Sequence, residues 1–241
     1  MSSIFDQKKF FKEIEPLISK EMGTEHMSPF LYSFIKFVRP HRCLEIGAGL
    51  TTAYILRALK ELHDLEKEEM SGNESNYDLG RKNNDYYNLK HPEFILHSFD
   101  TLGHPKTTAK KIPEVAKNLE LESYLRFYNE DYNNLINVIP KEELKFDFIW
   151  CDLGGIREWL NYQNLLLPII SQGGGYIIFH STLSNVNGLA FLSQLKLKLL
   201  DGTIKDFELI SLLEPHKRSQ NSCTILRKVG GLANQIYSER P

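Results

Sequence analysis

The stretch Cys43-Leu44-Glu45-Ile46-Gly47-Ala48-Gly49-Leu50-Thr51-Thr52 decides the fold of this chain. The residues up to Ile46 predict a short buried strand, and the apolar spacing from Thr52 onward predicts a helix. Gly47 and Gly49 have no Cβ, so the backbone can turn tightly there and a ligand can lie against it. Glu45 ends an apolar strand, where an unpaired carboxylate is costly, so we expect it to have a partner.

The composition of the chain excludes several classes of protein. Its 241 residues, 41% of them hydrophobic, are enough for one domain with a large core. A net charge of -2 argues against a nucleic-acid partner. The polar start is unlike a signal peptide, and no apolar run is long enough to span a membrane. We therefore expect a cytoplasmic protein whose three cysteines are buried thiols.

Predicted strands alternate with predicted helices along most of the sequence. The strands cover residues 42–46, 94–100, 124–128, 146–151 and 176–179, followed by an antiparallel pair at 207–213 and 223–229. This order predicts an α/β fold with a Rossmann-like, doubly wound, mostly parallel seven-stranded sheet and an antiparallel C-terminal strand pair. N-terminal helices over 1–40 join the main domain of 41–229, which carries a solvated insertion at about 64–90, and 230–241 form a tail.

Polar residues follow the apolar runs at the predicted strand ends. They are Glu45, Asp100, Glu130, Asp131, Asp152 and His180. The carboxyl ends of parallel strands meet at one edge of a doubly wound sheet, and ligands bind outside that edge. Six polar groups at one edge are hard to explain by packing, so the sequence predicts a binding site there.

The glycine turn is not a dinucleotide fingerprint, because the third glycine position is occupied by Thr52. The pattern from Glu45 to Thr51 instead resembles the first motif of class I methyltransferases that depend on S-adenosylmethionine (SAM). The resemblance covers roughly residues 30–229 and includes the reversed strand near the end of the sheet. Within that class the chain is most similar to small-molecule O-methyltransferases of the catechol-like type.

The resemblance implies SAM as the cofactor and assigns residues to it. Asp100 matches the acid that holds the ribose hydroxyls, although it follows Glu45 by 55 residues where about 20 is usual, and the insertion accounts for the excess. Either Glu130 or Asp131 contacts the adenine. The expected cofactor residues are Glu45, Gly47, Ala48, Gly49, Thr51, Thr52, Asp100, Thr101, Glu130, Asp131 and Asp152.

The catalytic candidates are His180 and Asp152. An unperturbed histidine titrates near neutral pH, at about 6.5, so His180 is the candidate general base for a hydroxyl or amine acceptor. Asp152 could orient His180, bind the acceptor or hold its positive charge. The residues expected to bind the small-molecule acceptor are His26, Arg157 and Trp159. The second acid of the metal-dependent relatives is missing, and His180 is a poor magnesium ligand, so no magnesium site is expected. A softer metal held by Asp152 and His180 is the alternative that is not favoured, and the predicted set of metal ligands is empty.

Several alternatives remain open. The glycines could serve packing alone, and His180 could be a strand-end histidine bonded to a loop carbonyl. An NAD-dependent oxidoreductase and a non-catalytic SAM-binding module are the rival functions. The apolar N-terminal helix could also serve a homodimer.

Overall fold

The structure is a computed structural model, and it describes residues 7–19, 22–70, 93–152, 161, 163–171, 174–184 and 186–229. Residues 71–90 of the expected insertion and the expected tail at 230–241 lie outside the described residues. The seven strands form a sheet in the order β3-β2-β1-β4-β5-β7-β6. The chain divides into two compact units, which are described in turn.

The first unit comprises Met1–Arg42, Ala48–Ser98 and Leu102–Tyr128. Its elements are α1 (Gln7–Ile14), η1 (Glu15–Leu17), α2 (Met27–Val38), α3 (Leu50–Met70), β2 (Ile95–Phe99), η3 (Ala109–Lys111), α5 (Ile112–Asn118), η4 (Glu122–Tyr124) and β3 (Leu125–Tyr128). Pro16 lies in the 3-10 turn after α1, and Pro113 lies in the first turn of α5. Each proline thus lies at the start of a helical segment, where the N–H that proline lacks is not needed for a helical hydrogen bond.

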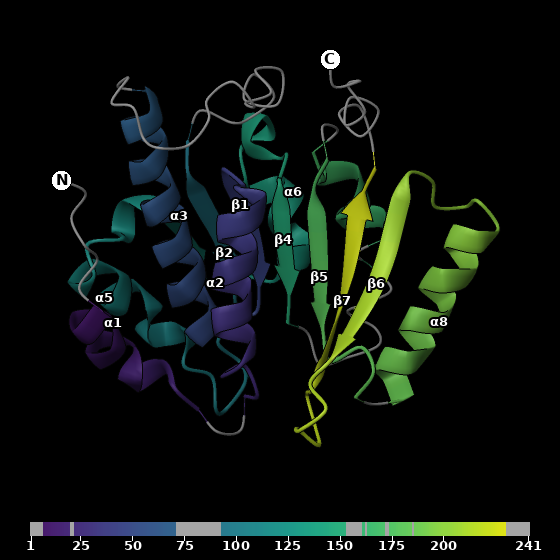
Figure 1. Cartoon of the computed structure of the whole chain (residues 1–241), viewed down its shortest axis with the longest axis horizontal. Helices are drawn as coiled ribbons and strands as arrows, with labels where there is room; N and C mark the ends of the chain where they lie inside the picture. The colour runs from purple at the N-terminus through teal and green to yellow at the C-terminus, as the bar shows by residue number, and fades with distance from the viewer. Residues whose placement is uncertain are drawn as a thin grey trace, which may run out of the picture. The chain divides into compact units, whose positions relative to one another are not determined.

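One arginine, Arg57, contacts all three of the helices α1, α2 and α3. Figure 1 shows α2 lying along α3. The guanidinium of Arg57 in α3 lies 4.7 Å from the ring centroid of Phe10 in α1 and 5.1 Å from that of Tyr32 in α2. Its Nε also donates to Glu61 Oε1 at 2.9 Å. Two cation–π contacts of Arg57 thus link α3 to α1 and to α2, while its ion pair with Glu61 lies within α3.

Helix α3 is longer than the sequence predicts. The solvated insertion was expected to begin at residue 64, but the helix continues to Met70. The reason is that Glu66 is buried, 4% exposed, and its Oε2 lies 2.9 Å from His41 Nε2. The polar side chain of Glu66 gives no sign in the sequence that this face of the helix is packed, because its partner His41 lies 25 residues away.

The second unit comprises Cys43–Gly47, Phe99–Thr101 and Asn129–Pro241. Its elements are β1 (Arg42–Ile46, which begins in the first unit), η5 (Tyr132–Asn134), α6 (Leu135–Val138), η6 (Lys141–Glu143), β4 (Phe148–Cys151), η7 (Leu167–Ile169), β5 (Tyr176–His180), α8 (Val186–Leu200), β6 (Phe207–Leu213) and β7 (Ser222–Lys228). Strand β4 pairs in parallel with β1 and β5, whereas β7 runs antiparallel to β5 and β6. The predicted Rossmann-like sheet with a reversed C-terminal strand is therefore confirmed.

One face of this sheet is covered by α8, which lies beside β6 in Figure 1. The rings of Phe179 in β5 and Phe191 in α8 meet edge to face, with centroids 5.4 Å apart. Residues Phe179 and Thr224 are register partners, so their side chains share that face. The residues that alternate with them, described below, point to the opposite face.

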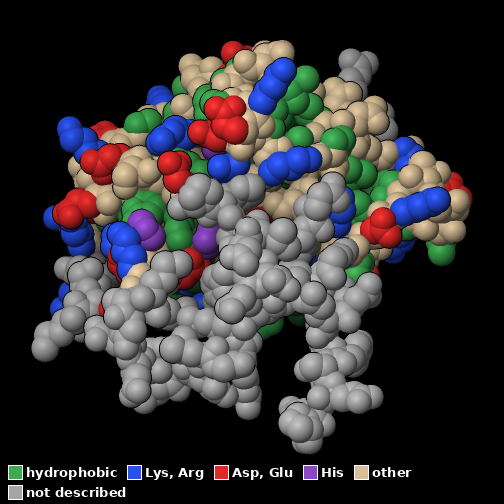
Figure 2. All heavy atoms as spheres, turned by 90° about the horizontal axis from the view of Figure 1, so that it is seen from above, with side chains coloured by type: hydrophobic (Ala, Val, Ile, Leu, Met, Phe, Trp, Pro, Cys, Tyr) green, Lys and Arg blue, Asp and Glu red, His purple; other side chains and the backbone are tan. Residues whose placement is uncertain are grey.

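The surface carries charges of both signs. On the face seen in Figure 2, lysine and arginine side chains are interspersed with aspartate and glutamate. This mixture agrees with the small net charge of the sequence. In the part of the chain that the structure describes, no helix is long and apolar enough to cross a membrane.

Candidate functional site

The candidate site begins where β1 and β4 end. The Gly47 N–H donates to the Phe99 carbonyl at 2.9 Å, and the Asp152 N–H donates to the Ile46 carbonyl at 2.8 Å. These bonds bring the residues after β1, β2 and β4 to one edge of the sheet, with Asp100 directly after Phe99. The strand order reverses between β1 and β4, and ligands of doubly wound sheets bind at such a reversal.

Gly47 is required at this bend for a steric reason. Its φ is +91°, and a Cβ there would lie 2.6 Å from the Asp152 carbonyl oxygen. The missing side chain therefore allows β1 to approach the end of β4, which is a packing role. At Gly49, by contrast, a Cβ would find its nearest neighbour, Thr108 Oγ1, at 3.6 Å.

Four of the chemically active side chains share one face of the sheet. Trp150 is the register partner of Glu45 in β1 and of Ile178 in β5. Asp152 follows Trp150 by two residues and His180 follows Ile178 by two, so both lie on that same face. The rings of Trp150 and His180 have centroids 5.5 Å apart. Glu45 itself is fully buried.

Asp152 and His180 form a close pair. His180 Nδ1 lies 2.7 Å from Asp152 Oδ1, and His180 Nε2 lies 3.3 Å from the carbonyl oxygen of Gln220. The His180 side chain is 1% exposed and that of Asp152 is 23% exposed. The structure therefore combines two sequence expectations, since His180 meets Asp152 and is also bonded to a loop carbonyl.

Burial and charge act in opposite directions on His180. Burial of the ring lowers its pKa, but the Asp152 charge, the hydrogen bond to Asp152 and the bond to the Gln220 carbonyl raise it more. Lys217 opposes them by lowering it. The pKa of His180 consequently lies above its ordinary value of 6.5.

Gln220 is a site residue that the sequence analysis missed. It precedes β7 with φ at +48°, a left-handed conformation that is unfavourable for a residue with a side chain. The Asn221 N–H donates to Ser184 Oγ at 3.1 Å, and Ser184 Oγ donates to Asn221 Oδ1 at 2.9 Å. The Ser181 N–H donates to the Ser222 carbonyl at 2.6 Å. These bonds tie Gln220 to the segment after β5, but nothing in the local sequence around Gln220 indicates this.

Trp150 contributes a buried donor. Its indole Nε1 has no hydrogen-bond partner within the described residues, although the side chain is fully buried. An unsatisfied buried donor costs about 1–3 kcal/mol, so it is unusual in a protein core. In the sequence, Trp150 stands out only as an apolar residue of the predicted strand at 146–151.

The two acidic side chains after β3, Glu130 and Asp131, accept hydrogen bonds from residues close to them in the sequence. Glu130 Oε1 accepts from the Asp131 N–H at 2.9 Å and from Asn134 Nδ2 at 2.9 Å. Asp131 is exposed and caps η5 by accepting from the Asn133 N–H at 2.8 Å. Their predicted contact with adenine stays a prediction.

The remaining predicted residues have the following positions. Asp100 is half-buried and Thr101 is exposed, both in the second unit. In the first unit, Ala48, Thr51 and Thr52 are buried at the start of α3, and Thr52 Oγ1 accepts from the Gly49 N–H at 2.9 Å. His26, also in the first unit, is the N-cap residue of α2 and makes no side-chain capping bond. Arg157 and Trp159 lie outside the described residues.

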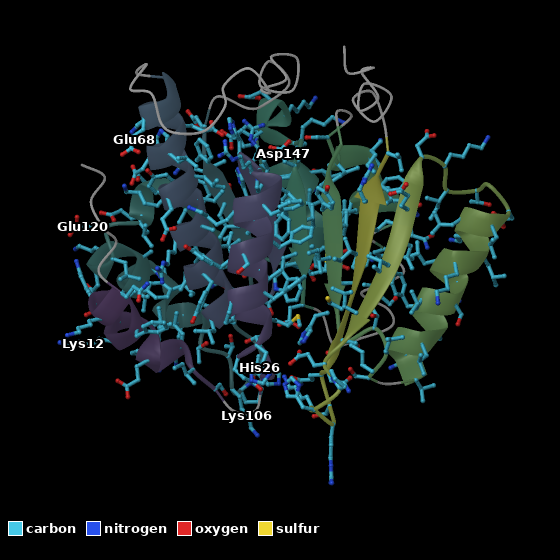
Figure 3. All side chains as sticks on the ribbon, in the orientation of Figure 1. Lys12, His26, Glu68, Lys106, Glu120 and Asp147 are labelled. Carbon is cyan, nitrogen blue, oxygen red and sulfur yellow. The ribbon has the colours of Figure 1, made fainter. Side chains whose placement is uncertain are left out.

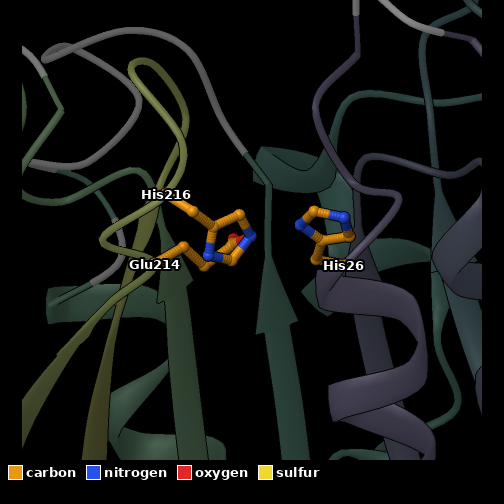
Figure 4. A group of neighbouring side chains, drawn as sticks. All are labelled: His26, Glu214 and His216. Atoms are coloured by element: carbon orange, nitrogen blue, oxygen red, sulfur yellow. The ribbon is translucent and has the colours of Figure 1, made fainter.

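The β6–β7 turn carries further polar side chains. Figure 4 shows Glu214 and His216 beside each other on this turn, where His216 Nε2 lies 3.9 Å from Glu214 Oε2. The Glu214 N–H donates to the Asn221 carbonyl at 2.6 Å, which closes the turn. The same turn therefore supports the position of Gln220.

Solved methyltransferases share this fold. The O-methyltransferase TomG of Streptomyces achromogenes, in complex with SAM, has a TM-score of 0.60 at 12% identity, covering 94% of this chain and 91% of that one. An O-methyltransferase of Bacillus cereus in complex with SAH, the demethylated product of SAM, has a TM-score of 0.57 at 15% identity, covering 95% and 93%. An SAH-bound methyltransferase of Podospora anserina has a TM-score of 0.52 at 12% identity, covering 91% and 87%.

At these identities the likeness shows the fold. No family model and no curated protein sequence matches the chain. The predicted resemblance to class I SAM-dependent methyltransferases is thereby confirmed at the level of the fold.

Proposed function

We propose that this chain is a SAM-dependent methyltransferase that acts on a hydroxyl group, or on an amine, of a small molecule. The observation that carries the proposal is the Asp152–His180 pair, 2.7 Å apart, at the carboxyl ends of β4 and β5. It stands beside the reversal of strand order, where ligands of this architecture bind. Solved proteins of the same fold hold SAM or SAH.

The side chains at this edge suit SAM chemically. A buried carboxylate at Glu45 and a half-buried one at Asp100 can accept hydrogen bonds from an amino group and from ribose hydroxyls. When bound, SAM supplies a methyl group on a positively charged sulfur, ready for in-line displacement. The protein then has to orient the acceptor and exclude water.

Asp152 is the member of the pair that a ligand can reach, because its side chain is 23% exposed. Its carboxylate can accept a hydrogen bond from the hydroxyl or amino group of the acceptor. Contacts of the acceptor with His26, Arg157 and Trp159, and the absence of a metal, stay predictions.

The role of His180 as general base also stays a prediction. In the structure its Nδ1 faces Asp152 and its Nε2 faces the Gln220 carbonyl. To take a proton from an acceptor, Nε2 would first have to leave that carbonyl.

Calorimetric titration of the purified chain with SAM and with NAD tests the proposal. We expect binding of SAM and none of NAD, and turnover of SAM to SAH when a pool of hydroxylated and amino metabolites is added. Binding of NAD instead would favour the oxidoreductase. Binding of SAM without turnover over a broad pool would favour the non-catalytic module.

Glu45→Gln is expected to weaken SAM binding about 10- to 100-fold, because a hydrogen bond to a charged group contributes about 1.5–3 kcal/mol. Asp147→Asn is the matched control. Asp147 is also a buried acid of this strand region, but it lies at the amino end of β4, as Figure 3 shows, where its Oδ1 accepts from Ser171 Oγ at 2.9 Å. Unchanged SAM affinity in a folded Glu45→Gln variant would contradict the assignment.

A further inference from the structure

The hydrogen bonds of the His180 ring carry a further inference. Both of its nitrogens face oxygen acceptors, Asp152 Oδ1 at 2.7 Å and the Gln220 carbonyl at 3.3 Å. A carbonyl and a carboxylate have no proton to donate, so the ring satisfies both only when each nitrogen carries a hydrogen. A neutral ring would direct a lone pair at an oxygen in a buried position, unless Asp152 itself were protonated.

We propose that His180 is a buried imidazolium cation that orients the Asp152 carboxylate toward the methyl acceptor, and that Asp152 is the residue of the pair that touches the acceptor. The inference rests on the proposed function. The exposed fractions of the two side chains, 1% and 23%, support this division, because a ligand can reach the carboxylate and not the ring. His180 is then a positioning residue, and its charge favours negative charge on a nearby acceptor oxygen.

Other charged and titratable groups among the described residues also lie around the ring. Cys223 in β7 is the register partner of His180, and its thiol pKa is raised to about 12 by burial and by Glu214, so it stays neutral. Lys217 in the β6–β7 turn disfavours the cation. Glu45 lies on the same face of the sheet, in β1. Among the described residues the Asp152 charge therefore provides the main stabilisation of a cation at His180.

The β6–β7 turn fixes the second acceptor. Gln220 keeps its left-handed conformation, with φ at +48°, because its neighbour Asn221 is bonded to Ser184 through both the backbone N–H and the side chain. Asn221 Nδ2 also donates to the Lys217 carbonyl at 2.7 Å. A strained residue held by its surroundings is typical of a functional position. Here the left-handed conformation directs the Gln220 carbonyl toward His180 Nε2.

The base role and the cation role predict opposite pH dependences. A base must be neutral, so methyl transfer would rise as the pH rises through the pKa of His180. A cation must be protonated, so methyl transfer would fall over the same range. The pKa of His180 is raised, which places this transition above the ordinary histidine value of about 6.5.

The direct test is nitrogen-15 NMR of the histidine rings in the full chain without ligand, at about pH 7.5, one unit above the ordinary histidine pKa. The chain has 8 histidines, so the His180 signals are assigned by their loss in His180→Gln. We expect protons on both ring nitrogens. If either Nδ1 or Nε2 carries no hydrogen at this pH, the inference is overturned. That outcome includes a neutral ring whose Nδ1 accepts a hydrogen bond from a protonated Asp152.

Asn221→Ala tests whether the turn holds the cation in place. We expect the midpoint of the His180 titration to fall, because the Gln220 carbonyl is no longer fixed. Ser184→Ala weakens the same link and serves if Asn221→Ala does not fold. Ser193→Ala is the control, since its Oγ bonds only the Leu189 carbonyl on the exposed face of α8. An unmoved midpoint in both turn variants would refute the role given to the turn.

Calorimetry with SAM on the same samples separates this inference from the proposed function. A doubly protonated ring in a chain that does not bind SAM overturns the methyltransferase proposal, and with it the role given to Asp152. SAM binding and turnover with a singly protonated ring overturn the cation. For the acceptor found in the turnover screen, His180→Gln is expected to lower kcat about 100-fold, and the wild-type rate is expected to fall with rising pH. A rate that rises instead would restore His180 as the base.

Discussion

Replacement of Gly47 by alanine tests how the site edge is built. Gly47 has φ at +91°, and a Cβ there would lie 2.6 Å from the Asp152 carbonyl oxygen. A left-handed conformation costs a residue with a side chain about 1–2 kcal/mol. Overpacking against a rigid backbone costs about 1–3 kcal/mol more. We therefore expect Gly47→Ala to lower the free energy of unfolding by about 3 kcal/mol, or the Tm by about 6–12 °C for a chain of this size.

Three further glycines separate the two causes. Gly202 has φ at +76°, but the nearest atom to a Cβ is the end of a lysine side chain at 3.8 Å, so Gly202→Ala measures the conformational cost alone. A Cβ on Gly188 in α8 would lie 2.7 Å from the Ser181 carbonyl without a positive φ. Gly188→Ala therefore measures the steric cost, less the about 1 kcal/mol by which alanine is favoured over glycine in a helix. Gly49→Ala has neither problem and is expected to be nearly neutral.

Calorimetric or urea unfolding of the four variants, without ligand, provides the comparison. The reasoning is refuted if Gly47→Ala is no more destabilised than Gly202→Ala. That result would mean that the end of β4 moves aside at little cost, and that the bend at Gly47 is not fixed by the Asp152 backbone.

Two other predictions concern the first unit. Arg57→Met is expected to cost about 2–3 kcal/mol, because it removes the charged contacts with the rings of Phe10 and Tyr32 and an ion pair; Lys9→Ala, which breaks an exposed ion pair, should cost less than about 1 kcal/mol in the same urea titration. Burial, aided by two arginines, lowers the pKa of His97 to about 3. Below pH about 6.5 the unfolded chain then binds a proton that the folded chain does not, so the free energy of unfolding falls toward acid pH by up to about 1.4 kcal/mol per pH unit. His97→Phe should flatten this slope in unfolding curves measured between pH about 6.5 and about 4.5. An unchanged slope would contradict the assignment.

Much of the fold follows from local sequence signals. Pro16 and Pro113 each lie at the start of a helical segment, where a proline is tolerated. The bend at Gly47 follows a buried strand, and acidic residues follow the neighbouring strands. Strand alternation with helices and the reversed final pair were enough to predict the sheet. These signals are readable because each one acts within a few residues of the chain.

The missed features depend on distant partners. Glu66 belongs to a buried helix because His41 lies against it, and Gln220 belongs to the site because its carbonyl meets a ring 40 residues earlier. None of these contacts leaves a periodic pattern in the sequence, so composition and spacing cannot find them.

The position of β7 has a consequence for how the chain folds during synthesis. It is the last described strand in the sequence, yet it lies between β5 and β6, which are both made before it. Until β7 leaves the ribosome, β5 presents an open edge and β6 has no strand to join, which exposes both to wrong partners. Gln220 is synthesised just before β7. Its carbonyl can therefore bond His180 Nε2 only when β7 takes its place between β5 and β6.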